Sequence, residues 1–263
     1  MTKTLVLYSL RCQKSENRFL YNLKYFIDNG GIIDNKNIDY LLIVNSTEKP
    51  KIDLPKKVKL LLKPNFGHGW GGWYEGLQTV NIKDYEYFCV IKDIFIGPFM
   101  YEWMDKNWIT YLKNLITERT QLITNNIPIS IRRKNIVPRV NAGFMFFTNK
   151  VLNLLIDNNF FTDKCPYRKK DKILCKILLR KENINIKALD QININIDYIN
   201  LRKINHKDKK FENIIKFLNN YKNDNIYSMI FVNIKSEKNF KNLKDKIDNI
   251  NNIKKKINEI NSL

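Results

Sequence analysis

One stretch decides how this chain folds: Tyr87-Phe88-Cys89-Val90-Ile91-Lys92-Asp93. Its apolar residues follow one another without the three- and four-residue spacing of an amphipathic helix, which indicates a buried strand. That strand stops at the charged pair Lys92-Asp93. Other apolar runs predict strands at Leu5–Leu10, Tyr40–Val44, Val58–Leu62 and Gly143–Phe147.

Helical patterns lie between these strands. Apolar residues recur at helical spacing from Phe19 to Ile27, and Gly30-Gly31 ends that helix. Further helices are expected at Trp73–Val80, at Trp108–Ile116, from Val151 onward and at Lys172–Lys181. Strands that alternate with helices predict an α/β fold with a mostly parallel central sheet covered on both faces. Ligands bind such sheets outside the carboxyl ends of the strands.

A glycine-rich segment follows the third predicted strand: Asn65-Phe66-Gly67-His68-Gly69-Trp70-Gly71-Gly72-Trp73-Tyr74-Glu75-Gly76-Leu77. It holds five of the nine glycines and one of the two histidines. Glycine has no Cβ, so the backbone can turn sharply and approach a ligand closely. So many glycines disfavour a core strand. We therefore interpret the segment as a ligand-binding loop that precedes a short helix.

Composition sets broad limits on the class of protein. The 263 residues carry a formal net charge of +20, mostly from lysine in a background rich in Asn and Ile. An AT-rich genome encodes that composition, so the charge alone is weak evidence for a nucleic-acid partner. The cysteines form no CxxC pair, which favours a reduced compartment and gives no zinc signature; they are Cys12, Cys89, Cys165 and Cys175.

The sequence also predicts a soluble, cytoplasmic protein. The apolar N-terminal stretch ends at Arg11, too soon for a signal peptide. No apolar run reaches the ~20 residues of a membrane span. We expect one domain over residues 1–225 and a C-terminal strand and helical extension over 226–263. An amphipathic stripe from Leu243 to Ile260 either docks that helix onto the domain or forms a short coiled-coil homodimer.

Taken together, these segments resemble the rhamnan-synthesis-F-like glycosyltransferases of bacteria and large DNA viruses. The resemblance covers roughly residues 3 to 190. It rests on Asn65-x-Gly67 through Gly71-Gly72-Trp73, on Tyr87–Asp93 with Gly97-Pro98-Phe99, on Gly143–Phe147, and on Asp171-x-x-Leu174-Cys175 through Asn183-Ile184.

The resemblance implies a GT-A-like, Rossmann-type sandwich that transfers a sugar, such as the deoxysugar rhamnose, from a nucleotide donor to a glycan acceptor. If the chain is viral, the host cytoplasm is the expected location. Tyr8, Ser9 and Asn45 would border the nucleotide. The donor sugar would be held by Asn65, Gly67, His68, Trp70, Gly71 and Trp73, with the rings stacking on the sugar.

The remaining implied roles concern charge and proton transfer. Asp93 would face the diphosphate, through Mn²⁺ or Mg²⁺ if a metal binds, and Lys92 could replace part of the charge of that metal. Asp171 is the candidate general base for the acceptor hydroxyl, and Asp190 is a second candidate.

For several of these residues a structural explanation stays open. Arg139 and Asn141 either contact the acceptor or diphosphate, or cap the strand that follows them. An acid at Asp171 also suits the positive end of a helix. His68 contacts phosphate or sugar, or is structural.

The chain departs from the family at three positions. It has Gly69 where the family usually carries Asp, Lys92 where Asn or another small polar residue is usual, and Asp171 where Glu is common. A second hypothesis is therefore a catalytically silent protein of the same fold that binds nucleotide sugars or carbohydrates. A third is a basic nucleic-acid-binding protein, although no helix-turn-helix, zinc-finger or RNA-binding signature supports it.

Overall fold

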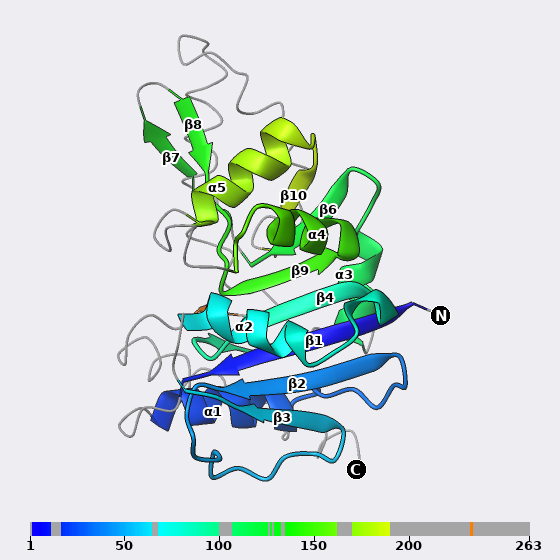
Figure 1. Cartoon of the computed structure of the whole chain (residues 1–263), viewed down its shortest axis with the longest axis vertical. Coiled ribbons are helices and arrows are strands. Elements are labelled where there is room, and N and C mark those ends of the chain that lie inside the picture. The colour runs from blue at the N-terminus through cyan, green and yellow to red at the C-terminus, as the bar shows by residue number, and fades with distance from the viewer. Residues whose placement is uncertain are drawn as a thin grey trace, which may run out of the picture. The chain divides into compact units, whose positions relative to one another are not determined.

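The chain folds around a mostly parallel sheet (Figure 1). The structure is a computed structural model, and it describes residues 2–11, 17–64, 68–99, 107–125, 127, 129–132, 135–161, 170–189 and 232–233. Within these residues, the main sheet has seven strands in the order β10-β6-β9-β4-β1-β2-β3. Only β9 is antiparallel to its two neighbours, β4 and β6. The prediction of an α/β fold with a mostly parallel sheet is confirmed.

The strands of the main sheet are β1 (Lys3–Leu10), β2 (Ile38–Val44), β3 (Val58–Leu62), β4 (Tyr85–Lys92), β6 (Thr120–Thr124), β9 (Phe144–Thr148) and β10 (Asn185–Ala188). Shorter strands are β5 (Phe95–Ile96), β7 (Ile129–Arg132), β8 (Asn135–Pro138) and β11 (Val232–Asn233), and β7 pairs with β8 as a hairpin. The helices are α1 (Asn17–Asp28), α2 (His68–Gln78), α3 (Trp108–Leu115), α4 (Asn149–Asp157) and α5 (Lys170–Lys176), the last followed by a π-helical turn at Ile177–Lys181.

Helices cover both faces of the sheet, as the continuous apolar runs of the central strands require. Along β1, Leu5 and Leu7 pack in one core with the α2 rings, whereas Val6 and Tyr8 pack in a second core with α1 and α3. The alternation follows from the two-residue period of a strand. Figure 1 shows α2 and α4 in front of the sheet. Successive polar residues at the end of a strand therefore point to opposite faces of the sheet, one toward α2 and the next toward α1.

The apolar runs located these central strands to within two residues, and β3 matches its predicted bounds. The prediction for the glycine-rich segment was wrong about where its helix begins. From His68 onward the segment forms α2, rather than a loop with a helix from Trp73. The physical reason is close packing: a Cβ on Gly76 would lie 2.7 Å from Ile43 Cδ1 and 3.1 Å from Leu41 Cδ2. These glycines let a helix approach the sheet.

The chain divides into two units, residues 1–232 and 233–263. The boundary that we predicted after residue 225, the amphipathic stripe and Asp190 lie outside the described residues, so the extension and its dimer stay predictions. Of the helices in the part of the chain that the structure describes, none has the length and apolar character needed to cross a bilayer.

Candidate active site at the carboxyl edge of the sheet

Three neighbouring parallel strands, β2, β1 and β4, end beside one another, and each is followed by a polar residue or ends at one. The backbone N–H of Asp93 donates to the Ser9 carbonyl at 3.0 Å, and the Asn45 N–H donates to the Leu10 carbonyl at 2.9 Å. The Lys92 N–H donates to the Gly143 carbonyl at 2.8 Å, at the start of the antiparallel strand β9. The structure therefore brings Ser9, Asn45, Lys92 and Asp93 to one edge of the sheet.

Asp93 is buried, with 1% of its surface exposed. Its Oδ2 accepts the backbone N–H of Arg11 at 2.5 Å, and the Arg11 Nε lies 3.2 Å from Oδ1. The Asn22 side chain, from α1, donates to the Asp93 carbonyl at 2.6 Å. Burial raises the pKa of Asp93 from 3.8 to about 6, although the charges and hydrogen bonds of Arg11 and the charge of Lys92 lower it. This carboxyl group is therefore held in one place by its hydrogen bonds, and its pKa lies well above that of an ordinary aspartate.

Ser9 and Asn45 face α2. The Asn45 Nδ2 donates to the Ser9 Oγ at 3.3 Å. A Cβ on Gly72 of α2 would lie 3.4 Å from that Oγ and 3.5 Å from the Asn45 Oδ1. The Oδ1 is buried and has no hydrogen-bond partner among the described residues. A buried acceptor without a partner is costly, so it favours a ligand or water at this position.

Lys92 also faces α2, where it takes the space that a side chain at position 69 would need. A Cβ added to Gly69 would collide with the Lys92 Cε and lie 3.4 Å from Nζ. The Nζ lies 5.1 Å from the centre of the Trp73 ring, within the range of a cation–π interaction. Gly69 and Lys92, two of the three positions that depart from the pattern of the family that the sequence resembles, therefore form one structural feature: the glycine makes room for the lysine.

The two indole rings do not lie open to a ligand. Trp73 is 0% and Trp70 2% exposed. The rings pack edge-to-face at 5.3 Å, and Trp70 also contacts Phe160 at 5.8 Å. Our expectation that these rings would stack on a sugar is therefore corrected, because both are part of the core. Their membership of the donor-binding set stays a prediction.

The other predicted residues are placed with less detail. The Asn141 Oδ1 accepts the Gly143 N–H at 3.2 Å, which supports the strand-capping explanation. The Arg139 Nε is buried without a hydrogen-bond partner in the described part of the chain. Asp171 lies in the first turn of α5, next to Lys170, whose Nζ is 5.8 Å from the Trp70 ring. Nothing is described of the Asp171 side chain.

The remaining predicted residues of the glycine-rich segment add little. Asn65 and Gly67 lie outside the described residues. His68 is the first residue of α2, without a described side chain, and Gly71 is in the first turn of the same helix. Their roles in donor binding stay predictions.

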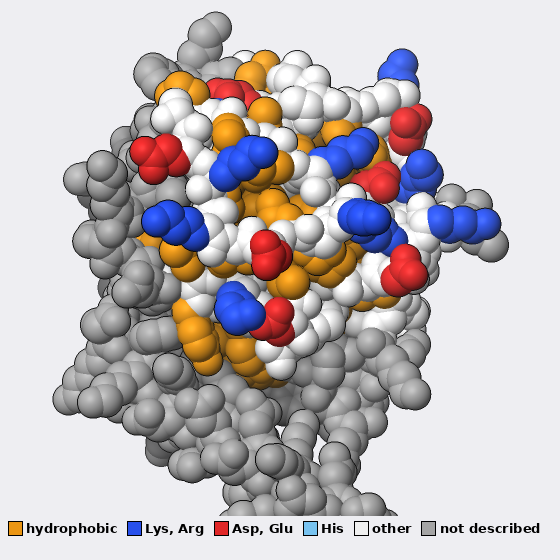
Figure 2. All heavy atoms as spheres, turned by 90° about the horizontal axis from the view of Figure 1, so that it is seen from below, with side chains coloured by type: hydrophobic (Ala, Val, Ile, Leu, Met, Phe, Trp, Pro, Cys, Tyr) orange, Lys and Arg blue, Asp and Glu red, His pale blue; other side chains and the backbone are white. Residues whose placement is uncertain are grey.

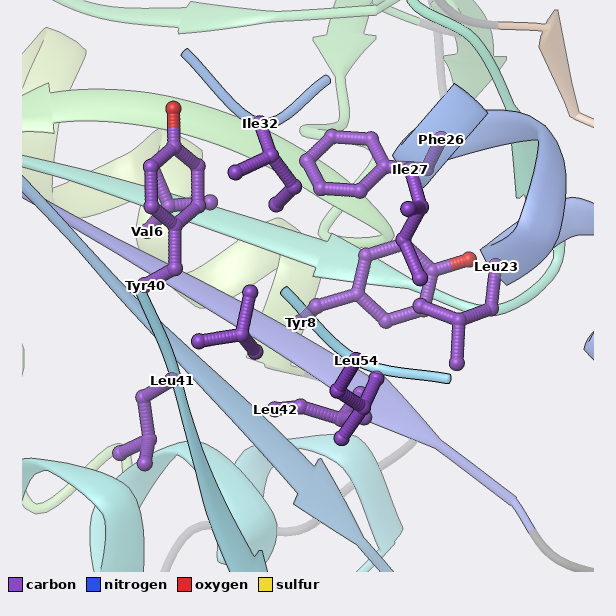
Figure 3. Close-up of a pocket in the computed structure, with 11 residues that line it drawn as sticks. Val6, Tyr8, Leu23, Phe26, Ile27, Ile32, Tyr40, Leu41, Leu42 and Leu54 are labelled. Carbon is purple, nitrogen blue, oxygen red and sulfur yellow. The ribbon is translucent and has the colours of Figure 1, made fainter. Parts of the chain in front are cut away.

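The side chains of Tyr8 and Ser9 lie on opposite faces of the sheet. The Tyr8 ring faces α1 and lies 5.3 Å from Phe26. Figure 3 shows Tyr8, Phe26 and Leu23 around a hollow under α1. The hollow is apolar and has a volume of about 10 Å³, room for no more than about one water molecule. A nucleotide does not fit there, so the expectation that the Tyr8 side chain borders the nucleotide is corrected: the parity of β1 points it to the opposite face.

Asp93 is the residue that we expected to hold Mn²⁺ or Mg²⁺. Such ions take several oxygen ligands. Here both carboxylate oxygens of Asp93 face Arg11, and Lys92 adds a second positive charge beside them. Among the described residues, no three His, Cys, Asp or Glu side chains are grouped so as to hold a metal ion. The residues described at this edge do not fit a divalent-cation site, and no chemical step is assigned to one.

Arg11 is the site residue that sequence reasoning missed. It follows β1 directly, and its guanidinium lies 4.4 Å from the centre of the Phe19 ring while it pairs with Asp93. The signal that could have found it was its position: a basic residue at the carboxyl end of a buried strand, in the same sheet as Asp93. We interpreted it only as the end of an apolar stretch.

The basic character of the chain does not produce a single positive field on the face shown in Figure 2, where Lys and Arg side chains alternate with Asp and Glu. The ion pairs among the described residues include Lys24 with Asp28 at 2.8 Å and Lys57 with Asp34 at 3.8 Å. A nucleic-acid interface would need a continuous basic surface.

No protein-family model and no curated protein sequence matches the chain. Solved structures to which the chain shows a low similarity include the glycosyltransferase GlyE of Streptococcus pneumoniae TIGR4, at 14% identity and a TM-score of 0.43. That match covers 90% of this chain but only 55% of GlyE.

Two other solved structures show a similar degree of likeness. A 4-diphosphocytidyl-2C-methyl-D-erythritol synthase from Anaerococcus prevotii matches at 12% identity and a TM-score of 0.42, over 84% of this chain and 99% of that one. A glycosyltransferase involved in glycosylation of the major capsid of PBCV-1 matches at 9% identity and a TM-score of 0.41, and the match covers 72% of this chain and 83% of that one. Identities and TM-scores of this size say nothing about substrate or chemistry, which must be inferred from the site.

Proposed function

We propose that the chain is a glycosyltransferase that uses a nucleotide-sugar donor and binds it at the carboxyl edge of β2, β1 and β4. The observation that supports this most is the convergence of Ser9, Asn45, Lys92 and Asp93 from three adjacent strands. Ligands of open α/β sheets bind at this edge. A deoxysugar donor such as rhamnose and a glycan acceptor are carried over from the family resemblance.

In this proposal each residue at the edge has a separate role. Ser9 and Asn45 hydrogen-bond the nucleotide, since Asn45 has a buried oxygen without a partner among the described residues. Asp93 fixes the end of β1 through Arg11 and so shapes the edge. Asp171, in the first turn of α5, takes the proton of the acceptor hydroxyl while that oxygen bonds to the anomeric carbon and the diphosphate leaves.

A turnover assay tests the proposal. Nucleotide sugars of several classes are incubated with the protein, and release of nucleoside diphosphate is measured with and without glycan acceptors. We expect turnover with one donor class, a loss of about 100-fold or more in Asp171→Asn, and a smaller loss in Asn45→Ala. Asp53→Asn, which changes an exposed acid outside the proposed site, is the matched control. Full activity in Asp171→Asn would remove the general base from the proposal.

The second candidate is a silent binding protein of the same fold. The close pairing of Asp93 with Arg11 and the filling of the space at Gly69 by Lys92 favour it, because the first neutralises the carboxylate and the second reduces the room at the edge. It predicts that a nucleotide sugar binds, by calorimetry, but is never consumed. Binding without product over several acceptors would select this candidate over the transferase.

A further inference from the structure

We propose that Arg11 binds an oxyanion group of the ligand, a phosphate or a carboxylate, through the two terminal nitrogens of its guanidinium. In the function proposed above this group is the diphosphate of the nucleotide-sugar donor, and that part of the inference rests on the proposed function. The oxyanion site itself rests only on the contacts of Arg11.

The first observation is the position of Arg11 at the edge where open α/β sheets bind ligands. Arg11 follows β1 directly, and the carbonyl of the residue before it, Leu10, accepts the backbone N–H of Asn45 at 2.9 Å. The backbone N–H of Arg11 donates to the Asp93 Oδ2 at 2.5 Å. These bonds tie residue 11 to the ends of β2 and β4, so Arg11 lies among the residues that converge at this edge.

The second observation is that the guanidinium is held in place on its inner side. Its Nε lies 3.2 Å from the Asp93 Oδ1 and 3.4 Å from Oδ2. Its central carbon lies 4.4 Å from the centre of the Phe19 ring, within the range of a cation–π interaction. A hydrogen bond at Nε and a ring against the central carbon both restrict rotation of the side chain. Binding a ligand therefore orders little that is not already ordered.

The third observation is that the outer end of the guanidinium is not used in these contacts. The Arg11 side chain is 41% exposed, whereas that of Asp93 is 2% exposed. Asp93 is satisfied by the Nε and the backbone N–H of Arg11, and no described residue accepts a hydrogen bond from the two terminal nitrogens. Their N–H groups form a planar fork, which suits two oxygens of one phosphate or carboxylate. The fork is thus fixed in direction and available to a ligand.

The charge of Arg11 is offset by that of Asp93, so the site does not depend on an excess of positive charge. It depends on hydrogen bonds from a charged donor, which are stronger than those between neutral groups. The carboxylate behind the guanidinium opposes an oxyanion in front of it. A neutral side chain at position 93 should therefore strengthen binding, provided that it still accepts the Nε–H, as the amide oxygen of asparagine does.

Isothermal titration calorimetry at low ionic strength in EDTA tests the site, with pyrophosphate and glucuronate as the phosphate and carboxylate probes. We expect pyrophosphate to bind the wild-type protein and to bind Arg11→Gln at least about tenfold more weakly. Lys24→Met is the matched control, because it also removes one positive charge from an ion pair, that of Lys24 with Asp28 on α1. Its affinity should equal that of the wild type.

A second comparison covers the case in which Arg11→Gln does not fold, since that variant leaves the buried Asp93 without its cation. Asp93→Asn removes the buried charge and is the background for this comparison. We expect Asp93→Asn to bind pyrophosphate at least about threefold more tightly than the wild type. The double variant Arg11→Gln/Asp93→Asn should bind it at least about tenfold more weakly than Asp93→Asn does.

The outcomes separate this site from the proposed function. Equal affinity with and without Arg11, an equal loss in Lys24→Met, weaker binding by Asp93→Asn than by the wild type, or no binding of either probe would overturn the site. Binding of glucuronate alone, lost with Arg11, would support the site and assign it to a carboxylate. If a nucleotide sugar is consumed while Arg11→Gln binds pyrophosphate as the wild type does, the proposed function stands and the site falls. If pyrophosphate binds through Arg11 but no nucleotide sugar binds, the site stands and the proposed function falls.

Discussion

Asp93 shows how one buried carboxyl group links the site to stability. Its pKa in the folded chain is about 6, against 3.8 for an ordinary aspartate. Between these values the folded state binds more protons than the unfolded state, so the free energy of unfolding falls as pH rises through this window. The shift corresponds to about 3 kcal/mol at ~1.4 kcal/mol per pKa unit. The contribution is complete below about pH 4 and lost above about pH 6.

The variant Asp93→Asn isolates this contribution, because its amide stays neutral at every pH. We expect the unfolding free energy of wild type minus that of Asp93→Asn to decrease by about 3 kcal/mol between about pH 4 and about pH 7. Urea denaturation at several pH values measures it. Asp53→Asn, which changes an exposed acid outside the site, is the control variant measured in the same way. A difference that grows with pH would mean that Arg11 dominates over burial.

For single residues, the sequence predicted polar residues at the ends of strands but not the residues with which they form hydrogen bonds or ion pairs. Lys92 and Asp93 were predictable because a charged pair ends an apolar run. The Arg11–Asp93 pair joins residues 82 positions apart, and no local pattern encodes such a contact. The opposite faces of Ser9 and Tyr8 follow from strand parity, which the order of residues along β1 already contains.

Helix α2 is the element on which the site depends, and its glycines differ in purpose. A Cβ at Gly76 would meet Ile43 and Leu41 at 2.7 and 3.1 Å, whereas one at Gly72 would meet its neighbours at 3.4–3.5 Å, ordinary contact distances. We expect Gly76→Ala to destabilise the fold by about 1–3 kcal/mol, from overpacking. Gly72→Ala should be neutral or stabilise it by up to about 1 kcal/mol, the helix propensity of alanine.

Thermal and urea unfolding of the two variants measure this difference, and each is the control for the other. Equal effects of the two substitutions would show that close approach to β2 is not the reason for the glycines.

Among elements, those with a continuous apolar run or a clear helical period were predicted well. β6 (Thr120–Thr124) and β10 (Asn185–Ala188) were missed because polar residues interrupt their apolar positions. β6 takes its place by pairing with β9 and β10, and β10 by pairing with β6. The start of α2 was misplaced because glycine disfavours helices in isolation, whereas here packing against the sheet outweighs that propensity.

At the scale of the whole molecule, the net charge of +20 predicts weak, non-specific attraction to nucleic acid. We expect binding to random duplex DNA at 50 mM NaCl, a loss of at least about tenfold in affinity at 200 mM, and equal affinity for unrelated sequences. Fluorescence anisotropy measures it. Tight binding at physiological salt with a sequence preference would instead support the nucleic-acid hypothesis.

The reversed direction of β9 has a consequence for how this scaffold can diversify. Because β9 runs against β4 and β6, it begins where those strands end, and the chain between β6 and β9, which includes the β7–β8 hairpin, must depart from and return to that same edge (Figure 1). The insertion can change in length and sequence while the register of the sheet is kept. In the function proposed above, changes in this insertion would alter the selectivity for the acceptor without altering the strand ends where we propose that the donor binds.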